Sequence, residues 1–392
     1  MRPPFSTRTE WDPRPNRLTA ALLARRERGG PVLDLTESNP TRCGLVVEGE
    51  KIRKALGRAE ILRYDPDPKG LRSAREAVAA LYRGAAAVTA DRIVLTASTS
   101  EAYAYLFRLL ANPGDELLAP SPCYPLFDFL ARLNDVGLRS YPLIENEGFR
   151  IDLERLRESV GPRTRAILVV NPGNPTGAFL KRDELEALDL VCEERGLALI
   201  ADEVFSDYGT GSDPSRVTSC VTDQPRALTF ALNGLSKMLA LPQMKLGWIA
   251  AAGPKEVLDE TIQRLEVVAD TYLSVNTPVQ AALPDLLALR PAIQARVGAR
   301  LAANRETLDR LLSPPHPARA LPSEGGWSAI LRVPATRSDE EWALELLERD
   351  GVLVQPGYFY DFPREGRLVV SLLPEEATFK EGMERIDARL AK

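Results

Sequence analysis

The chain has 392 residues, of which 44% are hydrophobic, so it can bury the core of two domains or of one large and one small domain. Its formal net charge of -5 argues against nucleic acid or an anionic membrane surface as the main partner. No apolar run reaches transmembrane length and residues 1–5 lack the apolar core of a signal peptide, so we expect a cytoplasmic protein that does not bind membranes.

The cysteines and the histidine exclude several kinds of catalytic site. Cys43, Cys123, Cys192 and Cys220 are scattered without metal-ligand spacing, so we expect reduced thiols and no metal site. The single histidine, His316, lies in a proline-rich stretch, so no Ser-His-Asp or Cys-His arrangement can form around a core histidine. Acid–base work in an enzyme of this composition would fall to lysine, carboxylate, tyrosine or a bound cofactor.

Apolar strands and helices alternate along the first three quarters of the chain. Continuous apolar strands between helices are typical of a mostly parallel sheet with both faces covered, so we predict an α/β fold. The expected strands are 32–35, 93–96, 116–119, 139–143, 166–170, 197–201, 227–232 and 248–251, and the expected helices are 18–28, 71–83, 102–110, 124–133, 151–159, 183–195, 257–270, 278–289 and 291–312.

The rest of the chain predicts a smaller α+β unit. Its expected strands are 327–333, 352–354 and 368–373, and its expected helices are 339–350 and a terminal one from residue 377. We therefore expect a large domain over residues 51–289 and a small domain built from both chain ends, 1–50 and 290–392.

Polar residues stand at the ends of the expected strands. Ser98, Asn174, Asp202 and Lys237 all do so, and ligands of open α/β sheets bind beyond the carboxyl ends of the strands. A buried lysine easily loses its proton, and its free amine attacks an aldehyde. Two other interpretations stay open: Ser98 could simply cap a helix, and Lys237 could fold its stem over apolar surface.

Three motifs together resemble the fold-type I pyridoxal-phosphate enzymes, specifically the aspartate aminotransferase-like class I/II aminotransferases. They are Asn171–Gly177 (NPGNPTG), Asp202–Val204 (DEV) and Gly234–Lys237 (GLSK), in the family's order and spacing. The resemblance covers nearly the whole chain from about Leu33. It implies a three-layer sandwich, pyridoxal 5′-phosphate as cofactor, and a ping-pong aminotransferase acting on an amino acid and a 2-oxo acid.

The resemblance also implies residue roles. Lys237 would form a Schiff base with the cofactor and then shuttle a proton, while Asp202 would face the pyridine nitrogen and keep it protonated. Asn174 would bond the phenolic oxygen. Ser98 and Thr99 would bind the phosphate, Tyr124 would stack on the ring, and Tyr64 would reach the phosphate of a partner subunit, which implies a homodimer with shared active sites.

Some positions depart from the family pattern. Lys245 stands where an arginine is usual, and Phe205 stands where a tyrosine is frequent. The arginine that holds the substrate carboxylate is expected in the late strand, where the register is open between Arg367 and Val369. We predict that Arg367 binds the substrate, with Arg42 as its rival, and that Asn39, in a loop at the mouth of the site, binds the substrate as well.

Other functions on the same scaffold stay open at this point. A pyridoxal-phosphate lyase, synthase or cyclase would keep the same lysine, aspartate and asparagine, because a scaffold does not fix the reaction. A non-catalytic pyridoxal-phosphate-binding regulator would need a DNA-binding extension, and none precedes the first matched motif. The sequence does not identify the amino donor or acceptor.

Overall fold

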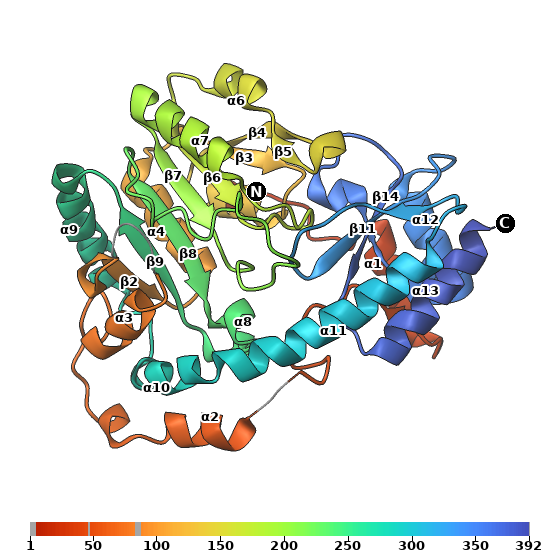
Figure 1. Ribbon diagram of the computed structural model, residues 1–392, viewed down its shortest axis with the longest axis horizontal. Coiled ribbons are helices and arrows are strands. Elements are labelled where there is room, and N and C mark those ends of the chain that lie inside the picture. The colour runs from red at the N-terminus through yellow and green to blue at the C-terminus, as the bar shows by residue number, and fades with distance from the viewer. Residues whose placement is uncertain (1–4, 46–47, 83–87, 392) are drawn as a thin grey trace.

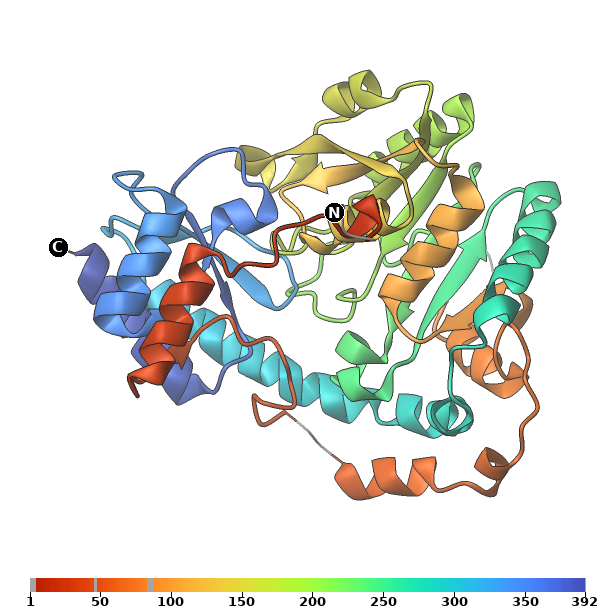
Figure 2. The ribbon, with the colours of Figure 1, turned by 180° about the vertical axis from the view of Figure 1, so that it is seen from behind.

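A central sheet organises the structure, which is a computed structural model describing residues 5–45, 48–82 and 88–391 (Figures 1 and 2). Over these residues its strand order is β2-β9-β8-β7-β6-β3-β4-β5. The parallel pairings run from β8 through β7, β6 and β3 to β4, whereas β9 is antiparallel to both its neighbours. This confirms the mostly parallel sheet. The strands are β2 Ile93–Thr96, β3 Glu116–Ser121, β4 Gly137–Ile144, β5 Arg150–Ile151, β6 Thr164–Val170, β7 Ala198–Asp202, β8 Thr229–Gly234 and β9 Gly247–Ala252.

Helices cover both faces of this sheet, so the sandwich has three layers. In β3, Leu117 and Ala119 pack into a cluster with α4, α5 and α9, while Leu118 packs into a cluster with α6 and α7 on the opposite face. Both faces of the strands are therefore shielded from water, which explains their continuous apolar sequences. The helices of this part are α2 Gly49–Leu56, α3 Arg72–Ala79, α4 Thr99–Leu110, α5 Leu126–Leu133, α6 Leu153–Ser159, α7 Arg182–Arg195, α8 Leu235–Met238, α9 Lys255–Tyr272 and α10 Thr277–Ala288.

The two ends of the chain pack together beside the sandwich. Strand β1 (Leu33–Asp34) pairs in parallel with β12 (Val352–Leu353), and α1 (Arg17–Glu27) lies beside the C-terminal helices in Figure 1. The two chain ends therefore meet, while the division into 51–289 and the two ends stays a prediction. The other elements here are the sheet β10 Arg319–Ala320, β11 Ser328–Arg332, β14 Arg367–Ser371 and β13 Gln355–Pro356, and the helices α11 Arg290–Leu311, α12 Asp339–Glu345, the π-helical turn Leu346–Asp350 and α13 Glu376–Leu390.

Several helices begin at other residues than the sequence suggests, and capping explains the shifts. The Ser98 hydroxyl accepts a hydrogen bond from Glu101 N, so α4 begins three residues earlier than expected. The Asp152 side chain accepts from Arg155 N, so α6 begins two residues later. The expected helix 71–83 is seen as Arg72–Ala79, and residue 83 itself lies outside the described residues.

Two features of the described part of the chain bear on other kinds of function. None of its helices is both long and apolar enough to cross a membrane. No group of three or more His, Cys, Asp or Glu side chains in the same ranges could hold a metal ion. All four cysteines are buried and unpaired.

Candidate active site

Lys237 projects from a four-residue helix at the end of β8. A Cβ added to Gly234, just before this helix, would lie 2.9 Å from the Cα of Gly247 on β9, so a glycine is needed where the two strands meet. The Lys237 Nζ lies 5.8 Å from the ring centre of Phe205 and 5.2 Å from that of Trp327. Burial lowers the pKa of Lys237, and the charge of Asp202 only partly opposes this shift.

Asp202 ends β7, the strand next to β8. Its carboxylate accepts a hydrogen bond from the Tyr103 hydroxyl at 2.9 Å and another from the backbone N–H of Val204 at 3.1 Å. Burial raises the pKa of Asp202, while these two donors and the charge of Lys237 lower it. The carboxylate is thus held in one orientation at the carboxyl edge of the sheet.

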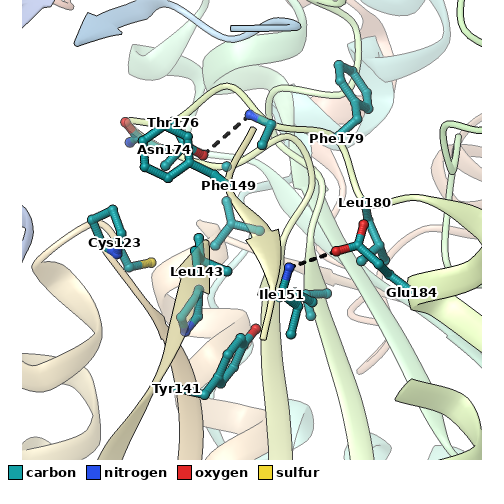
Figure 3. Close-up of a pocket in the computed structure, with 16 residues that line it drawn as sticks. Cys123, Tyr141, Leu143, Phe149, Ile151, Asn174, Thr176, Phe179, Leu180 and Glu184 are labelled. Carbon is teal, nitrogen blue, oxygen red and sulfur yellow. Dashed lines mark hydrogen bonds between the residues drawn. The ribbon is translucent and has the colours of Figure 1, made fainter. Parts of the chain in front are cut away.

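Asn174 lies in the loop that follows β6, and the buried Asn171 anchors this loop. The Asn171 side chain accepts from Leu180 N and donates to Val217 O, both at 3.0 Å. Asn174 is among the side chains that line a small cavity next to this loop (Figure 3). The cavity has a volume of about 30 Å³ and a mostly apolar lining, so it has room for little more than a water molecule.

The N-terminus of α4 closes another side of the site. Ser98, Thr99 and Ser100 form its cap and first residues, where backbone N–H groups and the helix dipole favour an anion. Gly247 packs against them, since a Cβ there would lie 3.2 Å from Thr99 N. Lys245, two residues before Gly247, has a left-handed backbone conformation with φ 52°.

These segments enclose one cavity of about 400 Å³. Its lining includes nine of the predicted residues or their neighbours: Ser98, Thr99, Ser100, Tyr124, Asn174, Asp202, Phe205, Lys237 and Lys245. The two chain ends build the facing wall, here called the neutral wall, which consists of Thr36, Ser38, Trp327, Ser328, Gln355, Tyr360 and Ser371. The cavity therefore lies between the central sandwich and the packed chain ends.

Sequence reasoning missed two residues of this site. Tyr103 bonds Asp202, and its signal was available, because Thr99 and Tyr103 are four residues apart and share one face of α4. Trp327 packs edge-on against Phe205 and Tyr208, and its indole N–H is buried without a partner among the described residues. No sequence pattern pointed to Trp327.

Three predicted residues do not line this cavity. The Asn39 side chain accepts hydrogen bonds from Thr41, while its neighbours Thr36 and Ser38 face the cavity instead. Tyr64 is 80% exposed and lines a separate small cavity. Arg367 differs most from its expected place at the substrate, because its Nε and Nη2 atoms donate to Glu145 at 2.9 and 2.7 Å.

The groups around the cavity fit pyridoxal 5′-phosphate. This cofactor presents an aldehyde, a basic ring nitrogen, a phenolic oxygen and a phosphate. Lys237 offers an amine with a lowered pKa, and Asp202 a fixed carboxylate. Asn174 offers an amide, and α4 an N-terminus beside Lys245.

Comparisons with known proteins agree with this geometry. The family described as "Aminotransferase class I and II" matches residues 32–386. The glutamate-pyruvate aminotransferase AlaA of Escherichia coli K12 is 29% identical over 89% of this chain and 87% of its own length. An alanine aminotransferase of Mycobacterium bovis is 28% identical over 91% of this chain and 85% of its own length. The crystal structure of an aminotransferase from Escherichia coli superposes with a TM-score of 0.87 at 26% identity, covering 100% of this chain and 99% of that one.

Proposed function

The chain belongs to the class I and II aminotransferases and is a pyridoxal-phosphate-dependent enzyme, and from this premise we propose that two half-reactions share the cavity around Lys237. In one, an amino acid gives up its amino group; in the other, a 2-oxo acid takes it. When bound, the cofactor supplies the aldehyde that receives the nitrogen and a ring that withdraws electrons. The convergence of an amine, a carboxylate, an amide and a helix N-terminus on one cavity supports this proposal.

Lys237 is proposed as the catalytic base and the covalent anchor of the cofactor. Its lowered pKa leaves a larger fraction of the amine neutral near pH 7, and a neutral amine can attack an aldehyde or take a proton from the substrate carbon. The faces of Phe205 and Trp327 beside the Nζ atom exclude water from it.

The other side chains are proposed to hold the cofactor. Asp202, fixed by Tyr103 and Val204, would keep the ring nitrogen protonated. Asn174 would donate to the phenolic oxygen of the cofactor. Phe205 would contact the cofactor ring but, because it has no hydroxyl, would donate no hydrogen bond to it. The remaining roles are phosphate binding by Ser98, Thr99 and Lys245 and ring stacking by the half-exposed Tyr124.

A homodimer with shared active sites is also proposed. Leu62 and Tyr64 are 88% and 80% exposed, and Val267 and Tyr272 are large exposed side chains as well. A contiguous patch of exposed apolar residues is typical of a surface that a partner covers, and we propose that these side chains contribute to such a patch. Sedimentation of the holoenzyme should show twice the chain mass. The proposed compartment is the cytoplasm, in keeping with four unpaired thiols.

Labelling tests the central assignment. Borohydride reduction of the holoenzyme and peptide mapping should place the pyridoxyl label on Lys237, and Lys237→Ala should carry no label. A label on Lys245 would contradict the assignment. Adding a reactive amino acid before the borohydride should convert the cofactor to its amine form and abolish labelling, whereas a lyase would leave the label in place.

A further inference from the structure

The charges of the cavity lie on only one of its walls. Among the described residues that line it, the side chains that carry a carboxylate, an amine or a guanidinium are Asp202, Lys237 and Lys245, all from the segment between residues 98 and 247. The neutral wall, built from the two chain ends, contributes hydroxyl, amide and indole groups. Burial raises the pKa of Tyr360 well above its usual range, so its hydroxyl stays neutral as well.

Both lysines are committed to the cofactor in the proposed function. Lys237 meets the aldehyde. Lys245 lines the same cavity as Ser98 and Thr99 at the N-terminus of α4, and is proposed to bind the phosphate there. Among residues 5–45, 48–82 and 88–391, the substrate therefore meets no cation in the cavity that is free for it.

Arg367, on the late strand β14, does not supply a cation for the substrate either. Three opposite pairs share one face of β11 and β14: Ser328–Ser371, Ile330–Val369 and Arg332–Arg367. Ser371 lines the cavity, so Arg367 lies four residues further along β14, roughly 13 Å away at the rise of an antiparallel strand.

The guanidinium of Arg367 is also fully engaged. Its Nε and Nη2 donate to the carboxylate of Glu145. Its Nη1 donates to the carbonyl oxygens of Gly366 at 3.0 Å and Glu365 at 3.3 Å. The rival from the N-terminal loop, Arg42, is exposed and lies 3.5 Å from Glu37, outside the cavity lining. Neither arginine is placed to pair with a substrate carboxylate.

We propose that the substrate selected by this cavity has no carboxylate on its reacting carbon: it is a primary amine or, in the reverse direction, an aldehyde. A carboxylate enclosed without a cation loses its hydration uncompensated, whereas a hydrogen at that position loses no comparable hydration. This inference rests on the proposed function, since it assumes that the cavity is the reaction site.

The proposed reaction balances as amine plus 2-oxo acid giving aldehyde plus amino acid. The amine carbon loses a proton, two electrons and its nitrogen, and water supplies the aldehyde oxygen. The same nitrogen, electrons and a proton reach the carbonyl carbon of the 2-oxo acid, whose oxygen leaves as water. Among the described residues, the carboxylate of this acid meets only neutral donors that are free, such as the indole N–H of Trp327, which has no partner there, so the acid should bind weakly.

Matched substrate pairs test the inference on the wild-type holoenzyme. Phenylalanine and phenethylamine, and likewise leucine and isoamylamine, differ only by the carboxylate on the reacting carbon. Single-turnover conversion of the cofactor to its amine form should be at least tenfold faster, per unit concentration, with the amine. If every amino acid reacts as fast as its amine or faster, the inference is overturned while the proposed function stands. If neither member of any pair converts the cofactor, the proposed function fails and the inference with it.

A binding measurement gives a second readout that does not depend on turnover. Ser328→Arg puts a guanidinium on the neutral wall, and Ser328→Gln is the uncharged control. Calorimetry with succinate should show at least tenfold tighter binding to the Ser328→Arg holoenzyme than to the wild type, and no gain for Ser328→Gln. Wild-type affinity equal to that of Ser328→Arg would overturn the inference, because it would show a cation already present. Should Ser328→Arg fail to fold, the matched pairs decide alone.

Discussion

The hydroxyl absent from Phe205 should change how the bound cofactor titrates. A donor to the phenolic oxygen stabilises the state in which that oxygen carries a negative charge, and Phe205 offers no donor beside Lys237. Tyr208 does not replace it, because its hydroxyl donates to the Lys237 carbonyl oxygen at 2.6 Å. Phe205→Tyr should therefore lower, by up to about one pH unit, the pH at which the visible band shifts.

The titration has a clear control. Phe205→Leu removes the ring without adding a hydroxyl, so its visible band should shift at or above the wild-type pH. An unchanged titration in Phe205→Tyr would show that another donor already meets the phenolic oxygen. Spectrophotometric titration of the wild-type, Phe205→Tyr and Phe205→Leu holoenzymes between pH 5 and 10 measures the pH at which the visible band shifts in each.

Single residues were predicted best where a strand end fixed their place. Asp202 and Asn174 follow buried strands, and parallel strands bring their carboxyl ends to one edge, so the sequence put both on the same cavity. Arg367 shows the limit of this reasoning. Alternation correctly put Arg367 and Val369 on one face, but it says nothing of how far along the strand the cavity reaches, nor that Glu145 from a distant segment takes the guanidinium.

At the scale of elements, the sequence predicted strands better than their directions. Strand β9 has the same continuous apolar sequence as its neighbours because it too is buried on both faces, yet it is antiparallel. Only 12 residues, 235–246, separate β8 from β9, and they hold a single helical turn followed by a 3-10 turn. A parallel strand usually needs a longer crossover helix to carry the chain back, and this connection holds only two short turns, so the absence of a long helical pattern between the strands was the informative signal.

The contact between β9 and α4 carries a second prediction. A Cβ on Gly247 would lie 3.1 Å from Asn233 O and 3.2 Å from Thr99 N, and both are backbone atoms that move only with their elements. Gly247→Ala should push the N-terminus of α4 away from its place beside Lys245 and weaken cofactor binding about tenfold or more, since the helix terminus and the cation act together on the phosphate. Equilibrium dialysis measures the affinity of the wild type and of Gly247→Ala for the cofactor.

A second glycine provides the matched control. Gly298 lies within α11, and a Cβ there would meet nothing within 4 Å. Gly298→Ala should leave cofactor affinity unchanged and raise the free energy of unfolding by roughly 0.5–1 kcal/mol, the usual gain for alanine inside a helix. Equal cofactor affinity in both variants would show that the close approach at Gly247 has no part in binding.

At the scale of the whole molecule, the Arg367–Glu145 pair joins the packed chain ends to the central sandwich. Arg367 begins β14, and Glu145 directly follows β4. Their two parallel hydrogen bonds form a bidentate pair in which the arginine side chain is 5% exposed and the glutamate 25%. The residue expected to bind substrate thus connects two parts of the fold.

Removing the charge of Glu145 should therefore destabilise the protein as a whole. Glu145→Gln leaves a buried guanidinium facing an amide, and breaking such a pair costs roughly 2–3 kcal/mol once the partial exposure of Glu145 is allowed for. Glu50→Gln is the control, because Glu50 pairs with Arg53 on the surface, where ion pairs contribute about 0–1 kcal/mol. Urea unfolding of both variants, with the cofactor bound, measures the difference. Equal loss in the two would show that the chain ends are held to the sandwich without this pair, and that Arg367 is free to serve another partner.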